Sequence, residues 1–389
     1  MSRLNELIQS ICPNGIEYKN LKDVLSIERG KRVVKKQLSE VHGYPVYQNS
    51  LTPLGLYVEY NCPENTAFVI MAGAAGEIGY SRERFWAADD CFAIVCPSSI
   101  CSKYIYHVLL NEQIVLKRNV RKASIPRLSR DTLECLKIPL PPLAVQQEIV
   151  RILDSFTELT AELTAELTAR RKQYEHYRDE LLTFDGSVKR MALKDVCIKV
   201  QDGNYGKEYP SKSELLKSGV PLINGKAIHG TICKEALDFI SEEKNEELKK
   251  ARIATDDVLF LNRGNIGETA YVPSEFDNCN IGPQVTLLRA NKSKILPKYL
   301  EFALHSKDVR NFISRVGGGT IKFLSVEPIR QLEIPVPPLA IQKQIVSVLA
   351  RFDTLCNDLT SGLPAEIAAR QKQYEYYRDK LLTFKELER

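Results

Sequence analysis

Histidine is scarce in this sequence of 389 residues: there are five, and the ten cysteines never form a Cys-x-x-Cys pair. Structural zinc sites usually combine such cysteine pairs with histidine. The most regular group, Cys91, Cys96 and Cys101, is evenly spaced and does not fit a zinc site. We therefore expect no metal site, and we expect reduced thiols that are mostly packed in the protein interior.

Long apolar segments are missing as well. No run of 18 apolar residues occurs, which predicts that no helix spans a membrane. Residues 1–8 lack the apolar core of a secretory signal peptide, so we expect a cytoplasmic protein. Lysine and arginine outnumber aspartate and glutamate by 54 to 49, and the net charge of +5 gives weak support for a polyanionic partner.

The motifs of common enzymes are also absent. Residues 219–227 fit a phosphate-binding P-loop only in part, because five residues separate Gly219 from Gly225 and Ala227 stands where serine or threonine is needed. The glycine-rich residues 73–79 match no dinucleotide-binding spacing closely and favour a hairpin turn. Neither Gly-x-Ser-x-Gly nor His-Glu-x-x-His occurs, and the two Pro-Pro pairs lack the flanking residues of adenine methyltransferases. We expect a chain without catalytic residues.

Internal repetition is the strongest positive feature of the sequence. Residues 138–153 recur as 334–349 with the motif Pro-x-Pro-Pro-Leu-Ala-x-Gln, and residues 169–184 recur as 369–384 with the motif Lys-Gln-Tyr-Glu-x-Tyr-Arg-Asp-x-Leu-Leu. Such matches predict two diverged copies of one fold, each followed by a nearly identical helical segment. Weaker matches pair residues 21–24 with 193–196, 44–49 with 220–224, 76–79 with 264–267, 102–105 with 297–300, and 123–129 with 319–325.

The domains and the spacers between them differ in pattern. Residues 1–140 and 187–336 contain short apolar runs between glycine turns and predict two α+β domains, whereas residues 141–186 and 337–389 predict helical spacers. In the first spacer, apolar residues recur every three or four positions, which predicts one helix of about 39 residues and about 58 Å. The second spacer contains Ser361-Gly-Leu-Pro364, which predicts a break or a kink.

Basic and amide side chains gather beside glycines in the expected loops of both copies. Lysine and arginine suit phosphates or guanine, and asparagine and glutamine suit adenine, so these residues are candidates for contact with double-stranded DNA. A solvated surface charge, or an asparagine that caps its own turn, is the alternative at each position. The candidates are Lys31, Arg32, Lys35, Lys36, Gln48, Asn49, Arg118, Arg121, Lys122, Asn204, Tyr205, Lys207, Asn224, Lys226, Arg263, Asn265 and Lys322.

Tyrosines recur near the ends of both helical segments. Tyr174 and Tyr177 are spaced to share one helix face, as are Tyr374 and Tyr377. They could pack against the other long helix of the same chain, or they could receive another subunit, and the sequence leaves both alternatives open. We count these four tyrosines as candidates for partner binding.

Two diverged domains, each followed by these helical motifs, make the chain resemble the specificity subunit (HsdS type) of type I restriction–modification enzymes along essentially its whole length. Residues 29–36 with 44–49 resemble one type of target-recognition domain in that family, and residues 200–210 followed by 218–223 resemble another. The resemblance implies that each domain reads one half of a bipartite, asymmetric DNA site. It also implies that the spacers pack as an antiparallel coiled coil, set the gap between the half-sites and dock two methyltransferase subunits.

The resemblance assigns the chemistry to partner subunits. S-adenosylmethionine would belong to the methyltransferase, ATP and Mg would belong to the restriction subunits of the full complex, and this chain would hold no cofactor. Two other functions stay open on the residues alone: a stand-alone sequence-specific DNA-binding protein without a methyltransferase partner, and a coiled-coil scaffold with no DNA role. Salt-dependent binding of DNA by the chain would argue against the scaffold.

The spacers also carry a length argument. The offset between copies is 196 at Ile138 and Ile334 but 200 at Ala169 and Ala369, so the second spacer has four extra residues. The first spacer contains two Thr-Ala-Glu-Leu units, 160–163 and 164–167. One unit adds about 6 Å and a net rotation of about 40° to a helix, against about 3.4 Å and about 35° for one base pair. We expect each unit to correspond to one base pair of gap, with the difference in rise absorbed by tilt or DNA deformation.

Overall fold

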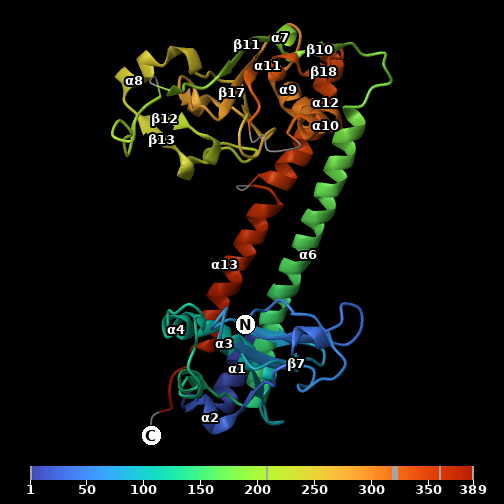
Figure 1. Cartoon of the computed structure of the whole chain (residues 1–389). Coiled ribbons are helices and arrows are strands. Elements are labelled where there is room, and N and C mark those ends of the chain that lie inside the picture. The colour runs from blue at the N-terminus through green and yellow to red at the C-terminus, as the bar shows by residue number, and fades with distance from the viewer. Residues whose placement is uncertain (1, 207–208, 318–322, 359–360, 388–389) are drawn as a thin grey trace. The chain divides into compact units, whose positions relative to one another are not determined.

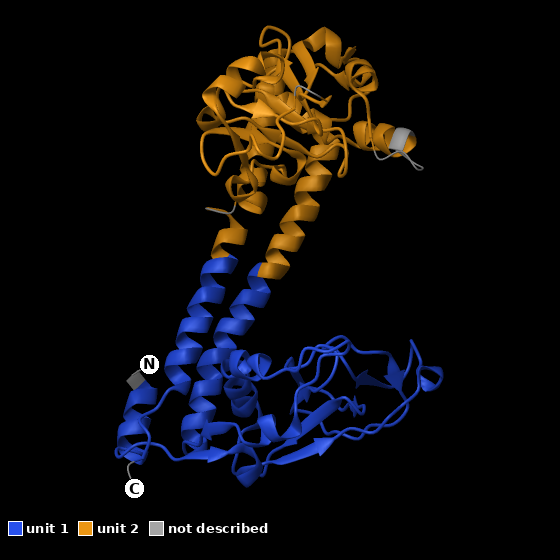
Figure 2. Cartoon of the chain, turned by 60° about the vertical axis from the view of Figure 1, so that its left-hand side comes forward, with its two compact units in different colours: residues 1–163, 367–389 blue, residues 164–366 orange. Residues whose placement is uncertain are grey.

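The computed structural model describes residues 2–206, 209–317, 323–358 and 361–387. The chain forms two compact units: the first contains residues 1–163 and 367–389, and the second contains residues 164–366 (Figure 2). The chain passes from the first unit to the second inside one long helix and returns inside its last helix (Figure 1). Each unit therefore includes parts of both spacers.

The first unit is built on two sheets. A four-stranded antiparallel sheet has the order β2 (Ser26–Arg29), β8 (Cys91–Val95), β5 (Thr66–Ile70) and β6 (Ile78–Ser81). A three-stranded sheet has the order β4 (Leu56–Tyr57), β3 (Tyr44–Tyr47) and β7 (Trp86–Ala87), and β3 runs parallel to β7. A separate pair joins β1 (Tyr18–Asn20) to β9 (Lys137–Pro139). Strand β5 is buried along its whole length, as expected for a strand inside the core.

Helices cover one side of the larger sheet in the first unit. Helix α3 (Ser102–Asn111) packs on β5 and β6 and buries Tyr104 and Ile105 completely. The start of the long helix joins the same core through Val145, Ile149 and Leu153, which are fully buried. The other helices are α1 (Ser2–Ile11), α2 (Leu21–Val24), α4 (Gln113–Arg118) and α5 (Arg130–Glu134).

The second unit repeats this topology. Its larger sheet has the order β11 (Cys197–Asp202), β17 (Val285–Ala290), β14 (Val258–Leu261) and β15 (Thr269–Tyr271). Its smaller sheet has the order β13 (Asp238–Ile240), β12 (Val220–Ile223) and β16 (Asn280–Ile281), and β10 (Arg190–Ala192) pairs with β18 (Glu333–Pro335). The helices are α7 (Leu193–Val196), α8 (Glu242–Glu247), α9 (Pro297–Leu304), α10 (Lys307–Gly317) and α11 (Val326–Gln331). The two predicted copies of one α+β fold are confirmed.

One sequence match between the copies is wrong in register. The β5–β6 turn is closed by Gly76 N, which donates to Ile70 O at 2.8 Å, and the β14–β15 turn is closed by Gly267 N, which donates to Leu261 O at 3.0 Å. The positive φ values agree: +83° and +84° at Gly73 and Gly76, +80° and +94° at Gly264 and Gly267. Residues 73–76 therefore match 264–267, and residues 76–79 do not. The shared letters Gly-x-Ile-Gly misled the alignment, because the left-handed positions of the turn fix the equivalence.

The motif Pro-x-Pro-Pro-Leu-Ala-x-Gln has a structural reason. The buried side chain of Gln146 accepts a hydrogen bond from Cys101 N and donates one to Pro141 O, both at 2.8 Å. Gln342 makes the same pair of bonds with Leu296 N and Pro337 O, also at 2.8 Å. One amide thus satisfies two backbone groups and ties the first turn of each spacer to the N-terminus of α3 or α9.

The spacers form three helices. Helix α6 (Leu143–Leu181) has 39 residues, which confirms the predicted long helix. The second spacer is divided into α12 (Leu339–Asn357) and α13 (Leu363–Leu382), which confirms the predicted break. Gly362 N donates to Asp358 O at 3.0 Å, and a Cβ at Gly362 would lie 2.4 Å from Thr354 O, so this close backbone approach needs glycine. Among the described residues, no helix is long and apolar enough to cross a membrane.

Helix α6 packs beside α13 in the first unit and beside α12 in the second (Figures 1 and 2). In the first unit Phe156 stacks on Tyr377, with ring centroids 5.3 Å apart. In the second unit Tyr177 contacts Phe352 at 5.5 Å, and an Arg171 guanidinium nitrogen lies 3.4 Å from Cys356 O. Residue numbers rise along α6 as they fall along α12, so this pair is antiparallel.

Candidate nucleic-acid interface

The turn between β5 and β6 gathers loops from distant parts of the first unit. Ala74 N donates to Asn49 O at 2.9 Å, which holds the end of β3 against the turn. Gly73 N donates to Pro126 O at 3.1 Å, and Leu128 N donates to Met71 O at 2.8 Å, which holds residues 121–128 on the same turn. A Cβ at Gly73 would lie 2.8 Å from Asn49 O, so the approach of these loops depends on glycine.

A second group of backbone contacts fixes the loop after β2. Gly30 N donates to Cys91 O at 3.0 Å, and a Cβ on Gly30 would lie 2.1 Å from Ala88 O. Lys31 O accepts from Trp86 Nε1 at 2.8 Å. Beside it, Gln48 Nε2 lies 3.4 Å from Asp89 Oδ1, and Arg29 Nε donates to Asp89 O at 3.1 Å. Gln48, directly after β3, is therefore oriented by the carboxylate of Asp89. The next residue, Asn49, is exposed.

The predicted cations of the first unit point into solvent. Their side chains are exposed, and in the part of the chain that the structure describes none of them forms an ion pair with a carboxylate. Unneutralised cations on loops suit phosphate groups, because their charge is not already compensated. These residues are Lys31, Arg32, Lys35, Lys36, Arg118, Arg121 and Lys122.

Backbone contacts identify the matching positions in the second unit. Gly203 N donates to Val285 O at 2.9 Å as Gly30 does to Cys91, so Asn204 matches Lys31 and Tyr205 matches Arg32. Asn204 is only 2% exposed, and its side-chain amide lies 3.2 Å from the side-chain amide of Asn280 inside the domain. Tyr205 is 63% exposed, with Lys250 Nζ 5.6 Å from its ring centroid. At this loop the second unit presents an aromatic ring where the first presents cations.

Asn224 and Lys226 are engaged within the second unit. Asn224 donates to Asp238 Oδ2 at 2.8 Å and accepts from Tyr209 OH at 3.0 Å, and Lys226 Nζ lies 2.8 Å from Asp238 Oδ1. Burial raises the pKa of Tyr209, so its hydroxyl stays protonated and donates. The carboxylate of Asp238 compensates the charge of Lys226. Lys226 should therefore attract a phosphate less strongly than the cations of the first unit do.

Arg263 lies on the β14–β15 turn, one residue before Gly264. Its guanidinium stands 4.9 Å from the ring centroid of Phe323, and its backbone pairs with that of Phe323 in an isolated antiparallel bridge. Asn265, on the same turn, lies 3.3 Å from the carboxylate of Glu268. Lys207 and Lys322 lie outside the described residues.

Three residues beside these candidates escaped the sequence predictions. Asp89 and Asp238 orient the amides of Gln48 and Asn224, and a lone aspartate gives no signal of such a role. The ring of Phe323 packs against the guanidinium of Arg263. The match of residues 123–129 with 319–325 pointed to this position, because it set Phe323 opposite a second loop arginine, Arg127.

The four candidate tyrosines all contact other parts of the same chain. Tyr174 and Tyr177 contact Phe352, at 6.4 and 5.5 Å between ring centroids. Tyr377 stacks on Phe156, and Tyr374 OH lies 3.2 Å from His107 Nδ1. Burial raises the pKa of Tyr374 to about 12, so its hydroxyl is protonated. Packing within the chain is therefore present, and Tyr177 still keeps 37% of its surface exposed.

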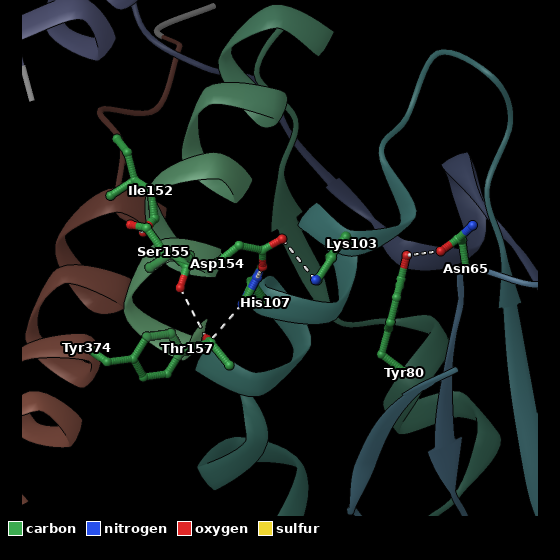
Figure 3. A network of polar contacts seen from close by, with 10 residues as sticks. Asn65, Tyr80, Lys103, His107, Ile152, Asp154, Ser155, Thr157 and Tyr374 are labelled. Atoms are coloured by element: carbon green, nitrogen blue, oxygen red, sulfur yellow. Dashed lines mark hydrogen bonds and ion pairs between the residues drawn. The ribbon is translucent and has the colours of Figure 1, made fainter. Parts of the chain in front are cut away.

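A buried polar network joins three helices of the first unit (Figure 3). Asp154 on α6 lies 3.3 Å from His107 Nε2 and 2.9 Å from Lys103 Nζ, both on α3, while Tyr374 on α13 contacts the other nitrogen of His107. Burial lowers the pKa of His107, which keeps its imidazole neutral. Burial alone would raise the pKa of Asp154, but hydrogen bonds from His107 and Lys103 outweigh it and lower that pKa. His107 is 1% exposed, and the side chains of Lys103 and Asp154 are 19% and 24% exposed, so the network fastens the three helices together around a buried imidazole.

Comparison with known proteins gives a consistent result. Residues 13–170 and 186–369 each match the Type I restriction modification DNA specificity domain. The chain is 38% identical over 392 residues to the specificity subunit of the Escherichia coli type I restriction enzyme EcoR124I/EcoR124II, covering 95% of this chain and 89% of that protein.

Solved structures agree on the fold. The S subunit of a type I restriction–modification system from M. genitalium matches with a TM-score of 0.63 at 17% identity, over 95% of this chain and 96% of that chain. A chain from a structural study of complex assembly and conformational transition in the type I R-M system matches with a TM-score of 0.60 at 17% identity, over 95% of this chain and 98% of that chain.

Proposed function

Because the chain belongs to the family of type I restriction–modification DNA specificity subunits, we propose that each of its two recognition domains binds one half of a bipartite, asymmetric site in double-stranded DNA. The loops that would contact DNA lie at matching strand ends in the two units. In the first unit they carry cations that have no carboxylate partner among the described residues, and in the second they carry Tyr205 and Arg263. Different side chains on one scaffold suit two different half-sites.

The observation that carries this proposal is the duplicated turn with its attached loops. Gly73 and Gly76 in the first unit, and Gly264 and Gly267 in the second, adopt similar positive φ values. In both units the start of the turn accepts a backbone bond from a later loop: Met71 O from Leu128 N, and Asn262 O from Leu324 N. Exposed loops on a rigid sheet are where proteins commonly place recognition residues. A scaffold whose only role is its helices would have no need for two such loop systems.

The helical spacers would set the distance between the half-sites and dock two methyltransferase subunits, with restriction subunits added in the full complex. Exposed apolar residues on these helices support the docking: Leu159, Tyr177, Ile341, Val348, Leu355 and Tyr376. The chain itself would be non-catalytic and hold no cofactor; S-adenosylmethionine would be bound by the methyltransferase, and ATP and Mg by the restriction subunits. Such a complex would act on DNA in the cytoplasm.

Co-expression with the cognate methyltransferase subunit, followed by sequencing of methylated adenines, tests the proposal. We expect one asymmetric motif with two defined parts and a fixed gap. Cells that express the methyltransferase alone serve as the control and should lack the motif. Sequence-specific binding by the isolated chain, with no motif methylated on co-expression, would instead support the stand-alone DNA-binding protein.

A further inference from the structure

In each recognition domain, an exposed arginine is one of the two residues of an isolated β-bridge, and this bridge lies at the same place in both domains. In the first unit Ala72, in the β5–β6 turn, pairs with Arg127; in the second unit Arg263, in the matching turn, pairs with Phe323. The next bond confirms the equivalence, because Leu128 N donates to Met71 O and Leu324 N donates to Asn262 O, both at 2.8 Å. Arg127 thus matches Phe323, and Ala72 matches Arg263. The arginine has changed sides of the bridge between the copies.

Both bridges are antiparallel. Side chains directly opposite one another in an antiparallel pair project from the same face, with their Cβ atoms about 4.5–5.5 Å apart. An arginine on either side of the bridge therefore emerges at nearly the same place on the domain. Moving the arginine from one partner of the bridge to the other changes the backbone position from which the side chain starts. The guanidinium still reaches the solvent at nearly the same place on the domain.

We propose that Arg127 and Arg263 are the specificity-determining arginines of the two domains, each reading the major-groove edge of a guanine in its own half-site. This inference rests on the proposed function and adds the residue and the base class. Arginine matches guanine because two parallel N–H groups of its guanidinium meet the O6 and N7 acceptors together.

The surroundings of Arg263 favour a base over a phosphate. Its guanidinium lies over Phe323, 4.9 Å from the ring centroid, and the ring is itself 38% exposed. Stacking occupies one face of the guanidinium and leaves its in-plane N–H groups available, which restricts their direction. A phosphate contact needs charge but little restriction in direction, whereas a two-pronged contact to a base edge needs both.

Backbone contacts hold Arg127 on both sides. Arg121 N donates to Arg127 O at 2.8 Å, and Arg127 also pairs with Ala72. On the side of the β5–β6 turn, Ala72 is small and only 1% exposed, and on the other side Arg127 pairs with Arg121, whose exposed side chain projects from the same face. Among the described residues neither Arg127 nor Arg263 pairs with a carboxylate, so neither charge is compensated within the chain.

Methylation-site mapping of Arg263→Lys and Arg127→Lys in the co-expressed methyltransferase complex tests the proposal. Lysine keeps the charge but loses the two-pronged geometry. We expect each variant to relax one guanine position, by about 5- to 150-fold in discrimination, and the two variants to relax opposite half-sites. Phe323→Leu should relax the same position as Arg263→Lys, while Phe323→Tyr keeps the ring and should keep the wild-type motif.

The wild-type complex provides a test that does not depend on variant folding. Replacing guanines of the mapped site one at a time with 7-deazaguanine removes the N7 acceptor, and one position in each half-site should lose binding. Arg263→Ala, which has no donor for N7, should bind the substituted and the normal duplex of its half-site equally. Unchanged motifs in both lysine variants, or a uniform loss of methylation with every letter retained, would refute base reading by these arginines. A wild-type complex that methylates no bipartite site would refute the proposed function itself.

Discussion

Single buried glutamines fix the junction between each recognition domain and its spacer. Gln146→Ala would orphan the Cys101 N–H, whose bond is half-buried, and the Pro141 carbonyl, whose bond is buried. We expect a loss of about 1–3 kcal/mol for each orphaned group. Urea denaturation, with hydrogen exchange of α3 amides as the local probe, would measure this loss. The exposed neighbour supplies the control, because Gln147→Ala should change stability by less than about 0.5 kcal/mol.

His305 should make the second unit sensitive to acid. Burial, aided by Arg178 and Arg310, lowers the pKa of His305 to about 4, and its Nε2 lies 2.7 Å from the buried hydroxyl of Thr269. A histidine of the unfolded chain titrates near pH 6.5. Between about pH 6.5 and 4 the unfolded chain therefore binds the extra proton, so stability falls as the pH falls, by at most about 1.4 kcal/mol per pH unit.

The variant His305→Gln keeps a group that can bond to Thr269 but does not titrate. Its stability should fall less steeply than that of the wild type over this pH range, as measured by thermal unfolding at a series of pH values. The same slope in both proteins would mean that His305 does not control the response.

The length of helix α6 should set the gap between the two parts of the methylated motif. The unit Thr164-Ala-Glu-Leu167 lies within the helix, with no glycine or proline nearby, so its deletion should leave the helix continuous. Because the net rotation of one unit, about 40°, is close to the twist of one base pair, the gap of the methylated motif should shorten by one base pair. Methylome sequencing reads both the gap and the letters. Changed letters at an unchanged gap would contradict the prediction.

The long elements were predictable because their signals are local. A stripe of leucines and tyrosines without interruption defines α6, and Gly362 with Pro364 defines the division of the second spacer. The register of the repeated turn was not predictable from letters, since Gly-x-Ile-Gly occurs at residues 76–79 and 264–267 but occupies different places in the fold. Backbone φ values and hydrogen bonds across the sheet decided it.

The candidate recognition residues were predictable only as types. Exposed cations beside glycines were found in the first unit, where loop positions coincide with solvent exposure. Asn204 and Asn224 were chosen by the same rule, yet each serves its own domain, Asn204 through Asn280 and Asn224 through Asp238. A sequence does not reveal which amide finds an internal partner, because those partners are 76 and 14 residues away.

The first unit is completed by both ends of the chain. Ile16 N donates to Lys385 O at 2.8 Å, Leu387 N donates to Ile16 O at 2.9 Å, and the hydroxyl of Tyr18 lies 3.3 Å from Phe384 O. In the second unit the matching segments, around Phe184 and Arg190, are joined directly along the chain. Each domain therefore packs on the start of its own spacer and on the end of the other spacer, which explains why both helical motifs are kept so similar in sequence.

The distribution of charge predicts unequal contributions to DNA binding from the two domains. Cations of the first unit, such as Arg121 and Lys122, have no carboxylate partner among the described residues, whereas Asp238 pairs with Lys226 in the second. Each phosphate contact contributes about 0.9 to the slope of log K against log salt. Arg121→Ala with Lys122→Ala should therefore lower the slope for the methyltransferase complex by about 1.8, with the methylated motif unchanged. Lys226→Ala is the matched control, because removing a compensated cation should lower it by much less. Equal changes per cation in both domains would show that pairing with Asp238 does not govern the contribution of Lys226.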